Sequence, residues 1–203
     1  MKRSRTMRMA LVAPVLLLAV GCGYNTIQSL DEQANQAQGQ IENQLQRRAD
    51  LIPNLVNTVK GYAQHEEDVF TQVAQARAGV LGAVQSHDPE QQANASAQMN
   101  TALGRLIAVA EAYPQLKADE QFNRLMDELT GTENRIAVAR GDYNTAVQQY
   151  NSYIRQFPQA LTAKVTGAKP RKYFQVTNPG AREAPTVDFS KPATPAPAAP
   201  TKP

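Results

Sequence analysis

The chain has 203 residues, of which 6% are aromatic and none is Trp. An aliphatic, Ala-rich core is therefore expected, which favours closely packed helices over a β-sandwich. The net charge of +3 does not indicate a nucleic-acid partner, because four of the basic residues lie together at the N-terminus (Lys2, Arg3, Arg5 and Arg8). Without them the 21 basic residues fall to 17, against 18 acidic ones. The single cysteine, Cys22, excludes an internal disulfide and a cysteine-based metal cluster.

The first residues have the order of a secretory signal: a basic start, an apolar run from Met9 to Val20, and small residues around Cys22. The apolar run is shorter than the roughly 20 residues that a spanning helix needs. Ala19-Val20-Gly21-Cys22 resembles a bacterial lipobox, with Ala19 where Leu is usual. We therefore expect a signal peptide at 1–21 and a lipid-anchored start at 22–24, with acyl chains on Cys22 that bind the chain to membrane lipid. The alternative is an uncleaved anchor or an ordinary signal with an incidental cysteine.

Gly23, rather than Asp, follows the cysteine, which resembles the pattern of lipoproteins sent to the outer membrane. The expected location is the bacterial cell envelope. The folded part would lie in the periplasm, tethered to the outer membrane rather than the inner one.

Residues 25–158 have the pattern of helix almost throughout. In the first helix the apolar residues are spaced three and four apart: Ile27, Leu30, Ala34, Ala37, Ile41 and Leu45. Pro53 ends or kinks this helix, and we favour a kink because the apolar stripe resumes at Leu55. A second helix is predicted to begin near His65, whose acidic followers suit a first turn.

A third helix is predicted to begin at Asp88-Pro89, where Asp88 can cap and Pro89 suits the first helical position. The last helix has a heptad pattern, with apolar or aromatic residues seven apart: Phe122, Leu129, Ile136, Tyr143, Tyr150 and Phe157. These segments predict an all-α protein, a long antiparallel four-helix up-and-down bundle at 25–158. We expect residues 159–189 to cap one end through Tyr173, Phe174, Val187 and Phe189. The Pro/Ala-rich tail at 190–203 should be disordered.

Several pieces of the sequence resemble the LemA family. The most specific runs from Arg47 to Val56 and continues with Val59-Lys60-Gly61-Tyr62-Ala63. Other pieces follow in order, among them Glu111–Lys117, Glu133–Ile136, Tyr143-Asn144, Tyr150-Asn151, Tyr173-Phe174 and Ala184–Phe189. The resemblance covers about residues 24 to 189, with Gln38 where many members carry Trp. It implies a membrane-associated four-helix bundle without established enzymatic activity, and a TPM-domain protein as the envelope partner by analogy.

The residues predict no catalytic site, no cofactor and no metal site. His65-Glu66-Glu67 lacks the second histidine of an HExxH motif, and neighbouring residues on a helix do not converge on one ion. The tyrosines of the third and last helices could form a ligand-stacking box, but at heptad spacing we favour core positions.

Arg47, Arg48, Asp50, Pro53 and Asn54 form the candidate interaction patch. They are either a recognition surface or an ion-pair network that stabilises the kink. We expect a non-enzymatic, membrane-tethered scaffold or interaction module. The alternative is an envelope protein that binds a small ligand, or a hydrolase, with its site in the bundle. Tight filling of the core by Ala, Leu and Ile would favour the first, and a polar-lined cavity of several hundred Å³ the second.

Overall fold

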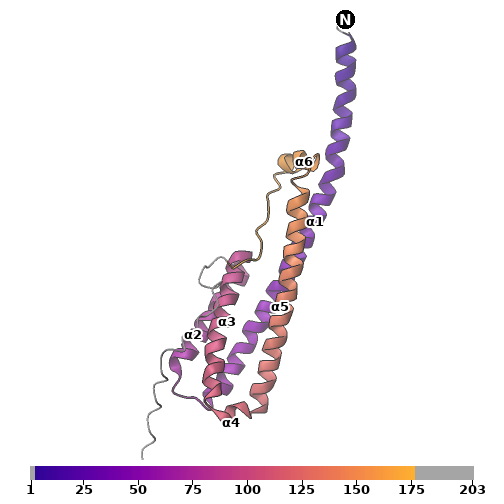
Figure 1. The fold of residues 1–203 in the computed structure, drawn as a ribbon. Coiled ribbons are helices and arrows are strands. Elements are labelled where there is room, and N and C mark those ends of the chain that lie inside the picture. The colour runs from indigo at the N-terminus through magenta and orange to yellow at the C-terminus, as the bar shows by residue number, and fades with distance from the viewer. Residues whose placement is uncertain (1–2, 177–203) are drawn as a thin grey trace, which may run out of the picture.

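The computed structural model describes residues 3–176, and the side chains of residues 23–176. This part of the chain is helical throughout its regular structure, with no strand, which confirms the all-α prediction. Six helices follow in order (Figure 1): α1 Arg3–Lys60, α2 Glu67–Ser86, α3 Pro89–Glu111, α4 Pro114–Lys117, α5 Glu120–Tyr153 and α6 Gln159–Thr166. The two additional helices, α4 and α6, are short and lie where we had expected a joint and a cap.

The first helix continues through Pro53 to Lys60, so Pro53 does not end it. Its apolar stripe is buried, with Ile41, Leu45 and Leu55 at most 1% exposed. α1 packs along α5 over much of its length, while its N-terminal part extends beyond the other helices (Figure 1). Among the described helices, none has a stretch that is long and apolar enough to cross a membrane.

The joint between α2 and α3 is two residues long, and α1 holds it in place. His87 ends α2 in the left-handed conformation, with a φ of 51°. Asp88 then caps α3, as predicted, by accepting a hydrogen bond of 2.9 Å from the N–H of Glu90. From α1, Glu42 Oε1 lies 2.9 Å from His87 Nδ1, and Gln38 donates to the His87 carbonyl at 2.7 Å. Polar contacts therefore fix the α2–α3 pair against α1.

The heptad positions of α5 face the core, as the sequence predicts. The buried members are Phe122, Leu129, Ile136, Tyr143 and Tyr150. Phe157 was assigned to the same seam, and this is wrong, because 83% of its surface is exposed. The helix ends at Tyr153, since Pro158 disfavours helical backbone at the residue before it.

One hydrophobic core runs through the bundle, built mainly from Ala, Val, Leu and Ile of α1, α2, α3 and α5. A smaller cluster joins α1, α5 and α6 through Ile27, Tyr150, Ile154 and Ala163. The main core is filled by aliphatic side chains, which is the arrangement that we expected of a scaffold.

After α6 the chain returns along α5 in an extended segment, residues 167–176, which we call the strap. Phe174, one of the apolar residues predicted for the cap, is 2% exposed and joins the main core. Asn144 and Asn151 of α5 bond the backbone of Phe174 and Arg171. Of the predicted cap, Val187 and Phe189 lie outside the described residues, as does the tail at 190–203.

Candidate interaction groove

The structure divides the five residues of the predicted patch. Arg47, Asp50, Pro53 and Asn54 are exposed on α1, and Asp50 accepts a hydrogen bond of 3.0 Å from Gln46 of the same helix. Arg48, by contrast, is only 7% exposed. The position of Arg48 in the apolar stripe, three residues after Leu45, is the signal that indicates its inward orientation. The patch is therefore not one continuous surface.

Arg48 crosses from α1 to α5, where it forms an ion pair with Glu133. Glu133 also accepts a hydrogen bond of 3.3 Å from Asn100 of α3, so this carboxylate links three helices. Burial lowers the pKa of the Arg48 guanidinium, and the Glu133 charge opposes this effect. Arg48 Nε is buried without a hydrogen-bond partner. A charged group with one unused donor therefore lies between the helices.

Pro53 has a structural consequence on the other side of α1. A proline cannot donate to the carbonyl four residues earlier, which here belongs to Ala49. Arg77 of α2 donates to that carbonyl through Nε at 2.8 Å. The donor to this carbonyl is therefore Arg77 of α2 and not one of the arginines of the predicted patch. The hydrogen bond from Arg77 to the carbonyl that Pro53 leaves free thus links α2 to α1.

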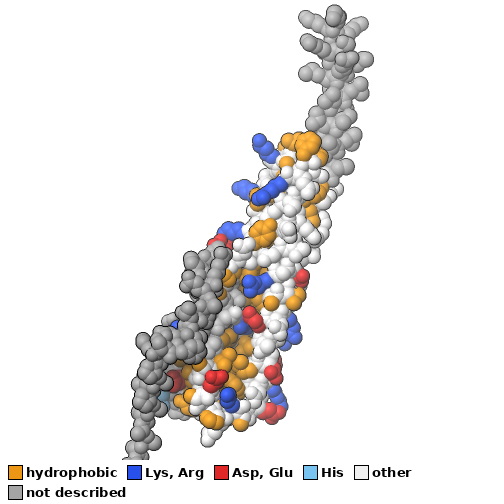
Figure 2. Space-filling view, viewed as in Figure 1, with side chains coloured by type: hydrophobic (Ala, Val, Ile, Leu, Met, Phe, Trp, Pro, Cys, Tyr) orange, Lys and Arg blue, Asp and Glu red, His pale blue; other side chains and the backbone are white. Residues whose placement is uncertain are grey.

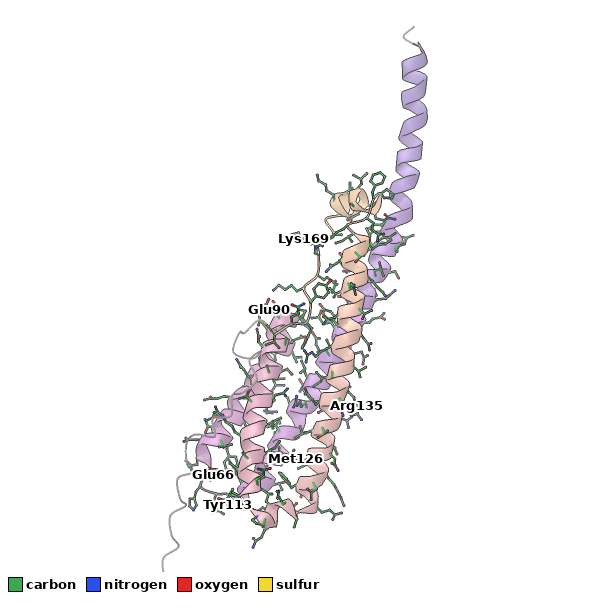
Figure 3. The ribbon with its side chains drawn as sticks, in the orientation of Figure 1. Glu66, Glu90, Tyr113, Met126, Arg135 and Lys169 are labelled. Atoms are coloured by element: carbon green, nitrogen blue, oxygen red, sulfur yellow. The ribbon has the colours of Figure 1, made fainter. Side chains whose placement is uncertain are left out.

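A groove of about 280 Å³ opens between α3 and α5, with Arg48 and Glu133 among its lining residues. Its apolar lining comes from Leu103 and Ile107 of α3 and from Met126 and Leu129 of α5. Figure 3 shows Met126 on the side of α5 that faces α3, and Arg135 on the opposite side. Figure 2 shows apolar side chains gathered on the same face, in the lower half of the molecule. We refer to this site as the α3–α5 groove.

The strap reaches from the end of α5 to the start of α3, above the α3–α5 groove. Asn144 bonds both the N–H and the C=O of Phe174, at 2.8 and 3.3 Å. Tyr143 donates to the Lys172 carbonyl at 2.9 Å, and the Lys172 ammonium lies 2.8 Å from Asp88 at the start of α3. An extended polypeptide therefore already lies between these two helices, with its backbone bonded by side chains of α5.

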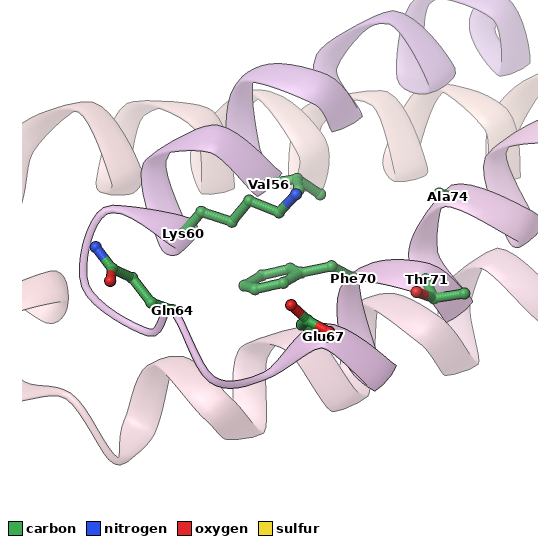
Figure 4. A pocket seen from close by; sticks show the side chains of 7 residues that line it. All are labelled: Val56, Lys60, Gln64, Glu67, Phe70, Thr71 and Ala74. Atoms are coloured by element: carbon green, nitrogen blue, oxygen red, sulfur yellow. The ribbon is translucent and has the colours of Figure 1, made fainter.

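A second hollow, of about 480 Å³, lies where α1 meets α2 (Figure 4). Lys60 lies over the ring of Phe70, with Nζ 5.2 Å from its centroid, and Glu67 lies beside the ring (Figure 4). The ammonium is thus held by a cation–π contact. This hollow is at the surface and not within the bundle core, so it differs from the cavity that a ligand-binding bundle would need.

The described residues contain no group of three or more His, Cys, Asp or Glu side chains that could hold a metal ion. His65 is exposed, in keeping with a solvated helix start. Cys22, the predicted lipid-attachment residue, lies outside the residues whose side chains the structure describes. Its modification stays a prediction.

Sequence reasoning missed Glu133, Arg77 and the two asparagines that hold the strap. Glu133 stands in the LemA-like piece Glu133–Ile136, but nothing in the sequence pairs it with Arg48, which is 85 positions earlier. Asn144 and Asn151 are seven apart, and their spacing places them on one face of a helix. No local signal indicates that their partners are backbone groups of a later segment.

Comparison with known proteins identifies relatives of this chain. The sequence model of one family, described as the LemA family, matches residues 37–189. "Magnetosome protein MamQ 2" of Paramagnetospirillum magneticum is 30% identical over 175 residues, which cover 75% of this chain and 64% of that protein. "Magnetosome protein MamQ" of Magnetospirillum gryphiswaldense is 27% identical over 174 residues, covering 74% and 64%. The matched part thus spans a little under two thirds of each relative's length.

Proposed function

Since the chain belongs to the LemA family, we propose that it is a non-enzymatic, membrane-tethered interaction protein of the bacterial envelope. The α3–α5 groove is the site that we assign to a partner. This groove combines an apolar lining with a buried guanidinium whose Nε has no acceptor. A surface that only closes a bundle would not need a charged group at that position.

The occupant that we propose is an extended segment of a partner protein. The strap supports this choice, because it is an extended segment that lies between the same two helices. Its backbone is held there by hydrogen bonds to side chains of α5. In the groove, Leu103, Ile107 and Met126 would contact an apolar side chain, and a backbone carbonyl or a carboxylate would accept from Arg48 Nε. A TPM-domain protein of the envelope is the partner class that the family analogy implies.

The alternative function, binding or hydrolysis of a small ligand, has the α1–α2 hollow in its favour. That hollow has a mixed lining of Lys60, Glu67, Phe70 and Thr71. It is open to solvent, however, and would enclose only part of a ligand. Its ammonium is already engaged by Phe70. We therefore place partner binding first.

The proposed tether is a lipid on Cys22, with the bundle in the periplasm and the outer membrane preferred over the inner one. Metabolic labelling with a fatty acid tests this part separately. The wild type should incorporate label, whereas Cys22→Ser should remain unlabelled and about two kilodaltons heavier, as expected for the mass of an uncleaved signal peptide. Equal labelling of both proteins would contradict the lipid tether.

Site-specific photocrosslinking in native membranes tests the groove. A photoreactive residue replaces Met126 in the α3–α5 groove, and a matched one replaces Arg135 on the opposite side of the same helix (Figure 3). We expect a discrete crosslinked protein from position 126 and none from position 135. Crosslinking at both positions, or only at position 135, would show that the groove is not the partner site.

A further inference from the structure

The end of the molecule that carries α6 has an unusual surface. Phe157, Leu161 and Val165 are 83%, 48% and 78% exposed, although they are large apolar residues. Leu161 and Val165 are four apart on α6 and therefore share one helix face. Tyr24 of α1, at the same end, is 45% exposed. Figure 2 shows apolar side chains at this end, next to Lys and Arg side chains.

The chain segment that contains α6 is basic. Between Tyr143 and Val176 the chain has five basic residues and no acidic one. Arg155, Lys164 and Lys169 are exposed beside the apolar face of α6. Arg171 is paired with Asp31 of α1, with Nε 2.7 Å from the carboxylate. The acidic residues Glu66, Glu67 and Asp68, of which the last two are exposed, lie at the start of α2, in the lower part of the molecule, where Figure 3 labels Glu66.

Packing fixes the position of α6 along α1. Gly23 is buried against α6, where an added Cβ would lie 3.5 Å from both Gln159 Cγ and Thr162 Oγ1. Cys22, the proposed lipid-attachment residue, directly precedes Gly23. It therefore lies one residue, or about 1.5 Å along the helix axis, from the contact with α6. A membrane that holds Cys22 through its acyl chains would lie next to α6.

We propose that the α6 face, formed by Phe157, Leu161 and Val165, docks on a lipid bilayer whose headgroups are anionic. The apolar side chains would enter the interfacial region, about 5 to 10 Å deep, and Lys164 and Lys169 would contact the headgroups. Contiguous exposed apolar side chains mark interaction surfaces, and a helix that lies in a membrane interface combines such side chains with basic ones. This inference rests on the proposed membrane tether and adds a second contact, which fixes the orientation of the bundle.

Tryptophan fluorescence of the full chain tests the inference, since the natural protein has no Trp. Leu161→Trp places an indole on the α6 face. Val138→Trp is the matched control, because Val138 is 66% exposed on α5 and lies outside the α6 face. Each variant is mixed with phosphatidylcholine vesicles containing 30% phosphatidylglycerol by design, with and without brominated lipid. Sedimentation with the vesicles is measured in parallel, as the separate readout of the tether.

For Leu161→Trp we expect a blue shift and loss of at least half of the emission with brominated lipid, and for Val138→Trp no change. Adding Lys164→Gln and Lys169→Gln should reduce the quenching several-fold, and vesicles without phosphatidylglycerol should have the same effect.

If the protein sediments but the indole at position 161 is not quenched, the docking inference fails while the tether stands. Failure to sediment would contradict both. Equal quenching without phosphatidylglycerol contradicts the anionic preference, and a concentration-dependent blue shift without vesicles would assign this face to a second copy of the chain.

Discussion

Arg47 and Arg48 are neighbours in the sequence but differ in their surroundings, because one faces solvent and the other is 7% exposed. Arg48→Ala removes one partner of a largely buried ion pair, and we expect a loss of about 2 kcal/mol in the free energy of unfolding. The loss stays below the values for fully buried pairs because Glu133 is 35% exposed and water can solvate it. Arg47→Ala should change stability by less than about 0.5 kcal/mol.

Urea denaturation of both variants measures this difference. Arg48→Met is a further control, since an apolar side chain of similar length often replaces a buried charge without loss. Equal stability of Arg48→Ala and Arg47→Ala would contradict the buried position of Arg48. It would return Arg48 to the exposed patch that the sequence indicated.

Arg77 is coupled to Pro53 through the Ala49 carbonyl. Arg77→Ala should cost about 1 kcal/mol, because it leaves a partly buried acceptor without a donor. In a Pro53→Ala background, the new backbone N–H can bond the same carbonyl. The cost of Arg77→Ala should then fall to less than half, which a double-mutant cycle measures. An unchanged cost in the two backgrounds would show that Arg77 acts elsewhere.

The sequence alone predicts part of this site. Pro53 identifies Ala49 as the freed acceptor, because the helical hydrogen bond joins positions four apart. The donor could not be predicted, since Arg77 comes from another helix and its approach depends on how α2 packs on α1. The pairing of Arg48 with Glu133 could not be predicted for the same reason, since it depends on how α1 and α5 pack.

Phe174 tests the packing of the strap, and Phe157, which lies outside the strap, is the control. Phe174→Ala should cost about 3 kcal/mol, because it removes a buried aromatic side chain from the core. Phe157→Ala, at a position that is 83% exposed, should stay within about 0.5 kcal/mol. Thermal or urea unfolding of both variants tests this pair. A small effect of Phe174→Ala would mean that the strap does not hold its place in solution.

The start of α3 should give the fold an acid-sensitive contact. The Lys172 ammonium, together with the N–H groups of Glu90 and Gln91, holds the pKa of Asp88 below its ordinary value, and burial opposes this only in part. A carboxyl whose pKa is lower in the folded state stabilises the fold above its unfolded pKa, which is about 4. That contribution is lost as the pH falls through the folded pKa.

Asp88→Asn separates the charge from the cap, since Asn caps helices as well as Asp does. At pH 6 the variant should be less stable by under about 1 kcal/mol, because the Lys172 partner is well exposed. The difference should shrink as the pH is lowered toward about 3, which urea unfolding at several pH values measures. A difference that is constant with pH would contradict a role for the Asp88 charge.

Helix periodicity predicts the elements well where local pattern decides the structure. The heptad of α5 places Phe122 to Tyr150 in the core, and Asp88-Pro89 marks the start of α3. It fails at Phe157, where the proline that follows overrides the heptad. The strap is predicted only through Phe174, because the side chains that hold its backbone come from α5, 20 to 30 residues earlier.

The whole molecule is a bundle with two distinct working surfaces in our account: a membrane-proximal end at α6 and a lateral groove between α3 and α5. Neither surface could be predicted from helix periodicity. Periodicity assigns each residue to a face of its own helix, but it does not say which helices meet. Arg48 of α1 and Glu133 of α5 line the groove, and Glu133 also accepts a hydrogen bond from Asn100 of α3, so the site needs three helices at once.

The central claim is that the α3–α5 groove binds a partner, and filling it tests this most directly. Gly104 lines the groove, and a Cβ added there would meet nothing within 4 Å. Gly104→Gln should therefore fill the groove without disturbing the fold. Gly82 of α2 has equally open space and lies outside the groove, so Gly82→Gln is the matched control.

Both substitutions replace a helical glycine and should leave the melting temperature unchanged or raised. The measurement is capture of the crosslinked partner from native membranes by the wild type and the two variants. We predict that Gly104→Gln loses at least nine tenths of the captured partner, while Gly82→Gln retains it. Full capture by a folded Gly104→Gln protein would contradict the groove as the partner site.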